Sequence, residues 1–207
     1  MKKEVVVVGY SGHAWVAIDI FISMGWKVIG YCEKVEKKKN PYGIKYFGNE
    51  QNSKTLALLK KQFVFPAIGD NKQRAKVVEY LLSQKLTIAN AVHSTAILSP
   101  NSFLGLGVMV GANVVVNSGS KIEDGVICNT LSVIEHECRI GKFAHIAPGT
   151  ILCGNVKIGS RTLVGANSVV SPTIEIGDDV IVGSGSVIVK NIKNKKVVVG
   201  GNPLREL

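Results

Sequence analysis

The chain has 207 residues, and 25 Lys and Arg against 15 Asp and Glu give it a formal charge of +10. Apolar residues make up 46%, which suits a packed interior and excludes a disordered chain. No stretch approaches the roughly 20 apolar residues of a membrane helix, so we expect no membrane span. Apart from Lys34 and residues 37–39 the basic residues are scattered and have no aromatic platform beside them, so we expect no nucleic-acid partner.

Residues 1–90 alternate between strand and helix patterns. Val5 to Val8 form a β-branched run, Gly9 and Gly12 bracket a turn, and residues 14–24 carry a helical pattern. The pattern continues with a strand at 27–31, a helix at 53–61, a strand at 63–68 and a helix at 71–84. Strands that alternate with helices indicate a parallel sheet with right-handed crossovers. We therefore predict an α/β, Rossmann-like domain over residues 1–90.

The glycine turn after the first strand allows two interpretations. Gly9 and Gly12 could hold a phosphate at a helix N-terminus, or they could form a purely structural turn. The full GxGxxG spacing is missing, which argues against NAD. His13 is then either a phosphate or sugar ligand or a capping residue, and we favour the ligand.

The second half of the chain is a repeat of six residues. Seventeen hexads run from Val92 to residue 193 without an insertion, and their first position is Val, Leu or Ile in all but one, where it is Cys128. The fifth position is small or β-branched, and glycine recurs at the second. We expect the first residue to point into a triangular prism, the fifth to pack beneath it, and the glycine to ease the corner. Residues 91–207 are thus predicted to form an all-β domain with a C-terminal tail.

Three hexads make one coil of the prism. At a strand spacing of about 4.8 Å the repeat gives a column on the order of 27 Å tall. The pattern resembles the hexapeptide-repeat, left-handed parallel β-helix family, and the left hand is taken from that resemblance. In that family three prisms assemble in parallel, which implies a homotrimer with active sites between subunits.

Four cysteines and four histidines are the remaining candidates for chemistry. Cys32, Cys128, Cys138 and Cys153 show no CxxC spacing, so we expect no zinc site or disulfide framework and a cytoplasmic protein. Cys128 and Cys138 take inward positions, whereas Cys153 points outward and leaves an acetyl-cysteine route open. His136 stands third in its hexad, beside Glu137. It is either a general base sharpened by that carboxylate or an ordinary surface histidine.

A family resemblance bears on that choice. Residues 129–138 (NTLSVIEHEC), then Ile140-Gly141, Phe143, His145 and residues 154–159 (GNVKIG), are similar to the sugar O- and N-acetyltransferases of bacterial glycan pathways. Residues 9–13 (GYSGH) and 67–71 (AIGDN) match the same family. The likeness includes sialic acid O-acetyltransferases and, more closely, N-acetyltransferases that act on nucleotide-linked 4-amino-sugars.

The resemblance implies a role for each matching residue. His136 would be the general base, Glu137 would sharpen it, and His145 would contact the thioester of acetyl-CoA. The pantetheine groove would be lined by Gly154, Ala166 and Ser184. The nucleotide-sugar would be held by Ser11, Gly12 and His13, with Glu33 and Gly69 nearby. At Glu33 the family often carries Asp, and here Cys32 precedes it in place of a second acid.

We therefore predict an acetyl-CoA-dependent N-acetyltransferase for the 4-amino group of a nucleotide-linked amino-deoxy sugar, with the UDP form favoured and no metal. The alternatives are a sialic acid O-acetyltransferase and a non-catalytic nucleotide-sugar-binding protein. A zinc carbonic anhydrase on the same fold would need three converging histidines. His136 and His145 lie half a coil apart, so we expect them to meet only across a trimer interface.

Overall fold

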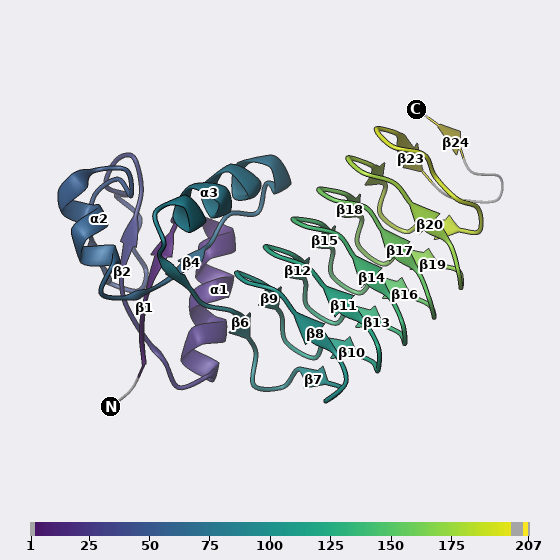
Figure 1. Cartoon of the computed structure of the whole chain (residues 1–207), viewed down its shortest axis with the longest axis horizontal. Coiled ribbons are helices and arrows are strands. Elements are labelled where there is room, and N and C mark those ends of the chain that lie inside the picture. The colour runs from purple at the N-terminus through teal and green to yellow at the C-terminus, as the bar shows by residue number, and fades with distance from the viewer. Residues whose placement is uncertain (1–2, 200–204, 207) are drawn as a thin grey trace. The chain divides into compact units, whose positions relative to one another are not determined.

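A computed structural model describes residues 3–199 and 205–206 of the chain (Figure 1). It divides into two compact units, residues 1–94 and 95–207. We call them the N-terminal and the C-terminal unit. The predicted boundary after residue 90 lies four residues before the observed division. Part of the predicted C-terminal tail lies outside the described residues.

The N-terminal unit is a parallel sheet with helices. Its elements are β1 (Glu4–Val8), α1 (Gly12–Ser23), β2 (Lys27–Cys32), β3 (Lys45–Tyr46), α2 (Ser53–Leu59), β4 (Phe63–Pro66), α3 (Asn71–Ser83), β5 (Thr87–Ile88) and β6 (Ala91–Val92). The strand order is β3-β2-β1-β4-β5, and every pair is parallel. The α/β prediction is confirmed. The elements predicted for this unit did not include β3, β5 or β6, because a strand of two residues is too short to show a periodicity.

Burial explains why these residues form the sheet and its first helix. Val5, Val6 and Val7 are fully buried in the central strand β1, as expected for a parallel strand covered on both faces. The buried residues of α1 recur at helical spacing and form one apolar stripe: Ala14, Ala17, Ile18, Ile20 and Phe21. Within the described part of the chain, none of the helices has both the length and the apolar character needed to cross a bilayer.

The C-terminal unit is a parallel β-helix of two-residue strands on three faces. Face 1 holds β7 (Ile97–Leu98), β10 (Val115–Val116), β13 (Val133–Ile134), β16 (Ile151–Leu152), β19 (Val169–Val170) and β22 (Val187–Ile188). Face 2 holds β8 (Phe103–Leu104), β11 (Lys121–Ile122), β14 (Arg139–Ile140), β17 (Lys157–Ile158) and β20 (Glu175–Ile176). Face 3 holds β9 (Met109–Val110), β12 (Ile127–Cys128), β15 (His145–Ile146), β18 (Leu163–Val164), β21 (Ile181–Val182), β23 (Val197–Val199) and the antiparallel β24 (Arg205–Glu206).

Pairing register and burial confirm the six-residue reading. Val115 pairs with Val133 and Val133 with Ile151, so each strand stacks on the one 18 residues away. The first hexad position is inward, as fully buried Ile134 and Leu152 show. Fifth-position hydroxyls are buried too, and Thr150 Oγ1 donates to the Gly165 carbonyl at 3.0 Å. A column of aliphatic side chains and short hydroxyl side chains, most of them hydrogen-bonded, therefore fills the prism.

The expected role of the second-position glycine is wrong. The left-handed corner residue is the fourth of the hexad, with φ of 55° at Asn113, 61° at Leu131 and 62° at Glu137. The second-position glycines are needed for close approach between coils instead. A Cβ on Gly111 would lie 2.7 Å from the Thr130 nitrogen, and one on Gly165 would lie 2.5 Å from the Ser184 nitrogen. Backbone contact between coils, rather than corner conformation, selects glycine there.

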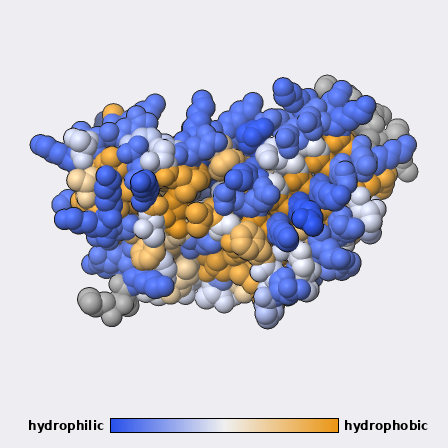
Figure 2. Space-filling model, viewed as in Figure 1, coloured by the Kyte–Doolittle hydropathy of each residue, from blue (hydrophilic) through white to orange (hydrophobic). Residues whose placement is uncertain are grey.

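The outward strand positions differ from face to face. On face 1 they form an aliphatic column of Ile97, Val115, Val133, Ile151, Val169 and Val187. On face 2 they are mostly exposed charged residues, Lys121, Arg139, Lys157 and Glu175. Figure 2 shows apolar side chains (orange) reaching the surface beside hydrophilic ones (blue). Face 1 therefore presents an apolar strip on the surface of the described repeats.

Candidate active site

His136 and Glu137 occupy the corner between β13 on face 1 and β14 on face 2. Their side chains are 61% and 69% exposed, and His136 Nδ1 lies 3.1 Å from Glu137 Oε2. When Nδ1 carries the proton it donates to this carboxylate, which leaves the Nε2 lone pair to accept a proton from a ligand. The fourth hexad position has a left-handed φ at every corner from Gly107 to Gly185, so the φ of Glu137 is no special strain.

Gly154 lies one coil beyond His136 and directly contacts its ring. A Cβ at position 154 would come within 2.6 Å of both Cε1 and Nε2 of His136. The Asn155 N–H donates to the His136 carbonyl at 2.8 Å and fixes the two coils against each other. The absence of a side chain at Gly154 thus leaves the space that the imidazole occupies.

His145 lies elsewhere on the prism, at an outward position of β15 on face 3. Its Nε2 is 3.1 Å from Asn129 Nδ2, so the amide donates to Nε2 and Nδ1 carries the ring proton. In a three-sided column the corner between faces 1 and 2 is opposite face 3. Within one chain the structure therefore keeps His136 and His145 apart.

The other residues predicted for the pantetheine groove form a separate stack. Ala166 and Ser184 both follow face 3 strands, at the corner that leads to face 1, and they are 18 residues apart. The Gly185 N–H donates to the Ala166 carbonyl at 2.8 Å. Gly154 does not join this stack, because it lies at the His136 corner.

Two of the three cysteines of the repeat do not compete with His136 as reactive groups, whereas Cys153 is half-buried and the acetyl-cysteine route through it stays a prediction. Cys128 and Cys138 are fully buried, as predicted, and burial raises their pKa to about 12 and about 11. The Cys138 thiol donates to the Cys153 carbonyl at 3.2 Å. No group of three or more His, Cys, Asp or Glu within residues 3–199 and 205–206 is placed to hold a metal ion.

In the N-terminal unit the predicted ligand residues line a cavity of about 710 Å³. It lies outside the carboxyl ends of β1, β2 and β4, and its walls include Ser11, His13, Glu33 and Gly69. Gly12 stands between Ser11 and His13 as the first residue of α1. Strand order reverses between β1 and β4, and such a switch point is where open α/β sheets bind ligands.

The N-terminus of α1 differs from those of the other two described helices, because no side chain caps it. The Asn52 side chain accepts from the Lys54 N–H at α2, and Asp70 accepts from the Gln73 N–H at α3. Ser11 makes no such side-chain bond at α1. The start of α1 therefore suits an anion beside the cavity.

His13 and Glu33 are held in different ways. Burial and, second, the Arg74 guanidinium lower the pKa of His13 to about 4, so its imidazole is neutral at pH 7. Both Glu33 carboxylate oxygens accept backbone N–H groups, from Tyr10 at 3.0 Å and from Lys34 at 3.3 Å. Glu33 thus ties the end of β2 to the β1–α1 turn.

Sequence reasoning missed several residues at these sites. The cavity is also lined by Lys34, Glu50, Gln51 and Lys76. Asn129 had no signal of its own, because only seven of the seventeen second hexad positions hold glycine. The cavity residues had none, since they come from loops and from a helix face that only the fold brings together.

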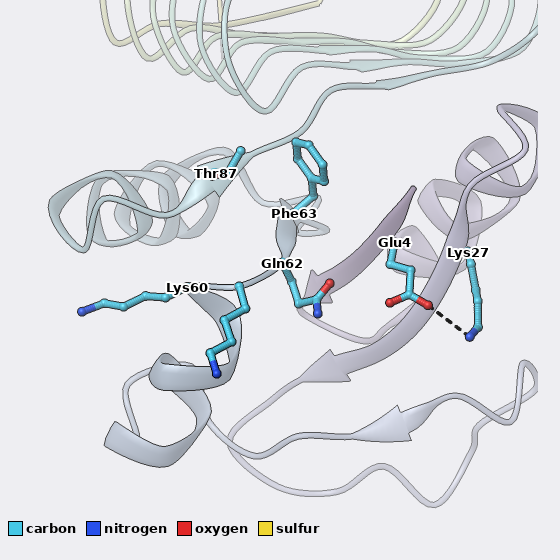
Figure 3. Close-up of a pocket in the computed structure, with 7 residues that line it drawn as sticks. Glu4, Lys27, Lys60, Gln62, Phe63 and Thr87 are labelled. Atoms are coloured by element: carbon cyan, nitrogen blue, oxygen red, sulfur yellow. Dashed lines mark hydrogen bonds and ion pairs between the residues drawn. The ribbon is translucent and has the colours of Figure 1, made fainter. Parts of the chain in front are cut away.

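A different cavity of about 680 Å³ lies at the amino ends of the strands (Figure 3). Figure 3 shows Glu4 paired with Lys27, and the Lys27 Nζ lies 3.1 Å from Glu4 Oε1. Lys60, Gln62, Phe63 and Thr87 complete the labelled lining. None of the predicted site residues lies there.

Two family models match the chain, the PglD N-terminal domain over residues 4–81 and the bacterial transferase hexapeptide (six repeats) over residues 155–190. GDP-perosamine N-acetyltransferase of Escherichia coli O157:H7 is 28% identical over 108 residues, which are 52% of this chain and 48% of that protein. The match therefore spans about half the length of this curated relative.

Solved structures match over nearly the whole chain. A histidine-to-asparagine variant of perosamine N-acetyltransferase from Caulobacter crescentus, in complex with CoA and GDP-perosamine, has 33% identity and a TM-score of 0.91, covering 99% of this chain and 96% of that one. The acetyltransferase domain of PglB from Neisseria gonorrhoeae, in complex with acetyl coenzyme A, has 29% identity and a TM-score of 0.90, covering all of both chains.

Proposed function

The chain belongs to the hexapeptide-repeat sugar acetyltransferases, enzymes that use acetyl-CoA, and we propose that its acceptor is the 4-amino group of a nucleotide-linked amino-deoxy sugar. The product would serve bacterial surface glycan biosynthesis. The observation that carries the chemistry is the exposed His136–Glu137 pair. His136 Nδ1 lies 3.1 Å from Glu137 Oε2, and the imidazole packs against Gly154 of the next coil. The four cysteines form no disulfide, which supports a cytoplasmic location.

The nucleotide-sugar is assigned to the cavity of the N-terminal unit. The N–H groups at the start of α1, after Ser11 and Gly12, suit the diphosphate. Lys34 and Lys76 on the cavity wall add positive charge. His13 offers a neutral imidazole that can donate at one nitrogen and accept at the other, and Gly69 lies against its ring.

The identity of the base is the finer part of the proposal. The sequence favours UDP, whereas the perosamine N-acetyltransferase of Caulobacter crescentus is in complex with GDP-perosamine. The Glu33 carboxylate accepts hydrogen bonds from backbone N–H groups. We therefore infer that it shapes the cavity wall more than it recognises the nucleotide base. UDP, dTDP and GDP forms therefore all belong in the test.

The chemical role of His136 follows from its geometry. An amine must lose its ammonium proton before its lone pair can attack a thioester, and a neutral imidazole near pH 7 can take that proton at Nε2. Glu137 keeps the Nδ1 tautomer in place and stabilises the imidazolium that forms. The amine nitrogen bonds to the acetyl carbonyl carbon and loses a second proton as the carbon–sulfur bond breaks. Of the two protons that leave the nitrogen, His136 passes one to the departing thiolate, and the other goes to solvent.

Acetyl-CoA supplies the acyl group, and we assign its thioester to His145 and its pantetheine arm to Ala166 and Ser184, with Gly154 at the His136 end. The Asn129 amide lies 3.1 Å from Nε2 of His145 and orients the ring on face 3. These residues lie on face 3 and its corner, away from His136 in the same chain. The arrangement favours an active site made by two chains.

We therefore propose a homotrimer. The aliphatic column on face 1 leaves Ile97, Ile151 and Val187 at 64%, 39% and 49% exposure, and a contiguous apolar strip of this kind marks a protein interface. Since the His136 corner borders face 1, packing of this face against a neighbour would bring His136 toward the neighbour's His145. Closed three-fold symmetry repeats the contact at each interface.

An acceptor panel tests the function. Purified protein is mixed with acetyl-CoA and with UDP-, dTDP- or GDP-linked 4-amino-6-deoxy sugars, or with a sialic acid, and free thiol is measured. We expect thiol release with at least one nucleotide-linked amino sugar and an acetamide at C4 by mass spectrometry and NMR. Release with the sialic acid alone would establish the O-acetyltransferase alternative. Nucleotide-sugar binding without any release would establish the non-catalytic alternative and overturn the proposal.

A further inference from the structure

A buried cation lies behind the cavity of the N-terminal unit. Arg74 is in the first turn of α3 and is only 1% exposed. Its Nη1 donates to the carbonyls of Ile68 at 3.0 Å and Gly69 at 2.8 Å, and its Nη2 donates to Asn71 Oδ1 at 2.7 Å. Burying a charge is costly unless it is hydrogen-bonded. The backbone of the β4–α3 loop supplies most of this compensation.

The β4–α3 loop, whose carbonyls Arg74 binds, forms one wall of the cavity. It contacts the β1–α1 turn at Gly9 and at His13. A Cβ on Gly9, where φ is +97°, would lie 2.9 Å from Ile68 Cγ1 and 3.0 Å from the Ala67 carbonyl oxygen. A Cβ on Gly69 would lie 3.5 Å from Cγ of His13. The Ile68–Gly69 segment is therefore packed between Gly9 and the His13 ring. A shift of its carbonyls would move the surface against which His13 rests.

Burial is the main cause of the neutral state of His13, and the same guanidinium adds to it. Burial lowers the pKa of Arg74 to about 9, so Arg74 stays charged at neutral pH and repels a proton on His13. The charged groups on the described cavity wall are Glu33, Lys34, Glu50, Asp70 and Lys76. Of these, Asp70 directs a side-chain oxygen to the Gln73 N–H and Glu33 is bonded to backbone N–H groups. The Arg74 charge is the second cause that lowers the pKa of His13, and burial is the first.

We propose that Arg74 is a positioning residue of the nucleotide-sugar site, which fixes residues 67–69 against Gly9 and His13. Together with the burial of the ring, its charge also keeps His13 an uncharged hydrogen-bonding group. The proposal rests on the proposed function, because it takes the cavity as the nucleotide-sugar site. Arg74 itself does not touch the ligand in this account. Its effect reaches the ligand through the loop backbone and through His13.

The test compares Arg74→Met with Arg74→Lys in the full chain. Arg74→Met removes both the bonds and the charge, so we expect the KM for the nucleotide-sugar to rise about 10-fold or more, with little change in the KM for acetyl-CoA. The His13 imidazole, followed by NMR, should titrate closer to the ordinary histidine value near 6.5. Arg74→Lys keeps the charge but not the forked geometry, so the KM should rise while the His13 titration stays low.

The matched control is Arg161→Met in the C-terminal unit. Arg161 is also largely held by its partners, through two 2.8 Å bonds from Nε and Nη2 to Asp179, but it lies far from this cavity in the chain. We expect this variant to leave the KM for the nucleotide-sugar and the His13 titration unchanged. Circular dichroism of each variant reports whether the fold is kept.

Three results would overturn the proposal: a folded Arg74→Met with unchanged KM, a folded Arg74→Met with unchanged His13 titration, or His13 of the native protein titrating near pH 6.5. The last measurement needs neither a variant nor a substrate. It therefore tests the charge state of His13 even where both variants fail to fold, and even where no nucleotide-sugar is acetylated. Failure of the proposed function would appear in the acceptor panel and leave this titration untouched.

Discussion

Replacing Gly154 by Ala tests whether the catalytic imidazole is positioned by the neighbouring coil. The added Cβ would lie 2.6 Å from Cε1 and Nε2 of His136, where ordinary contacts begin at 3.4 Å, so the ring must move by about 0.8 Å or turn away. The ring is exposed at the corner and free to do so. Misplacing a reacting group by about 1 Å can cost about 100-fold in rate. We therefore expect kcat to fall on the order of 100-fold while the fold is retained.

The assay is thiol release at saturating nucleotide-sugar and acetyl-CoA, and a double-mutant cycle provides the control. In a His136→Ala background there is no ring to displace, so adding Gly154→Ala should cost nothing further. A near-normal kcat in Gly154→Ala would contradict this explanation. So would a further fall in kcat when Gly154→Ala is added to His136→Ala, because Gly154 would then act on something other than the His136 ring.

Three further predictions concern pH, the interface and the core. Because the pKa of His13 is about 4 when folded and 6.5 when unfolded, the unfolded chain binds more protons between these values. Stability should be full above pH 6.5 and fall by about 3 kcal/mol as pH drops to 4, and urea unfolding of His13→Gln should lack this component. Ile151→Asp, in the face 1 column, should give monomers in sedimentation and abolish activity, whereas a trimer that persists would place the interface elsewhere. Ile134→Ala, at a fully buried position, should lower the free energy of unfolding by about 2–5 kcal/mol, and a loss below 1 kcal/mol would contradict the inward assignment.

The sequence predicts the β-helix well because the six-residue pattern that specifies this fold is local and repeated. Every hexad presents one aliphatic residue inward, so an exception at a single position such as Cys128 does not change the register. The same spacing, by itself, places His136 outside the apolar column. Handedness does not follow from the repeat and came from the family resemblance.

What the sequence could not show depends on contacts between distant residues or neighbouring coils. The link between Gly154 and His136 spans 18 residues and becomes visible only when coils stack. Arg74 resembles any other basic residue of an amphipathic helix until the fold buries it beneath the Ile68 and Gly69 carbonyls. Glycine at the second hexad position suggested a corner conformation, but its reason is the closeness of the next coil's backbone.

The turnover of His136→Ala with its nucleotide-linked amino sugar tests the central claim most directly. If His136 Nε2 removes the amine proton, kcat should fall by at least about 100-fold, as for the loss of a general base, while nucleotide-sugar binding is retained. Near-normal turnover of this variant across the pH range would show that the corner histidine is a surface residue and that the proton is taken elsewhere.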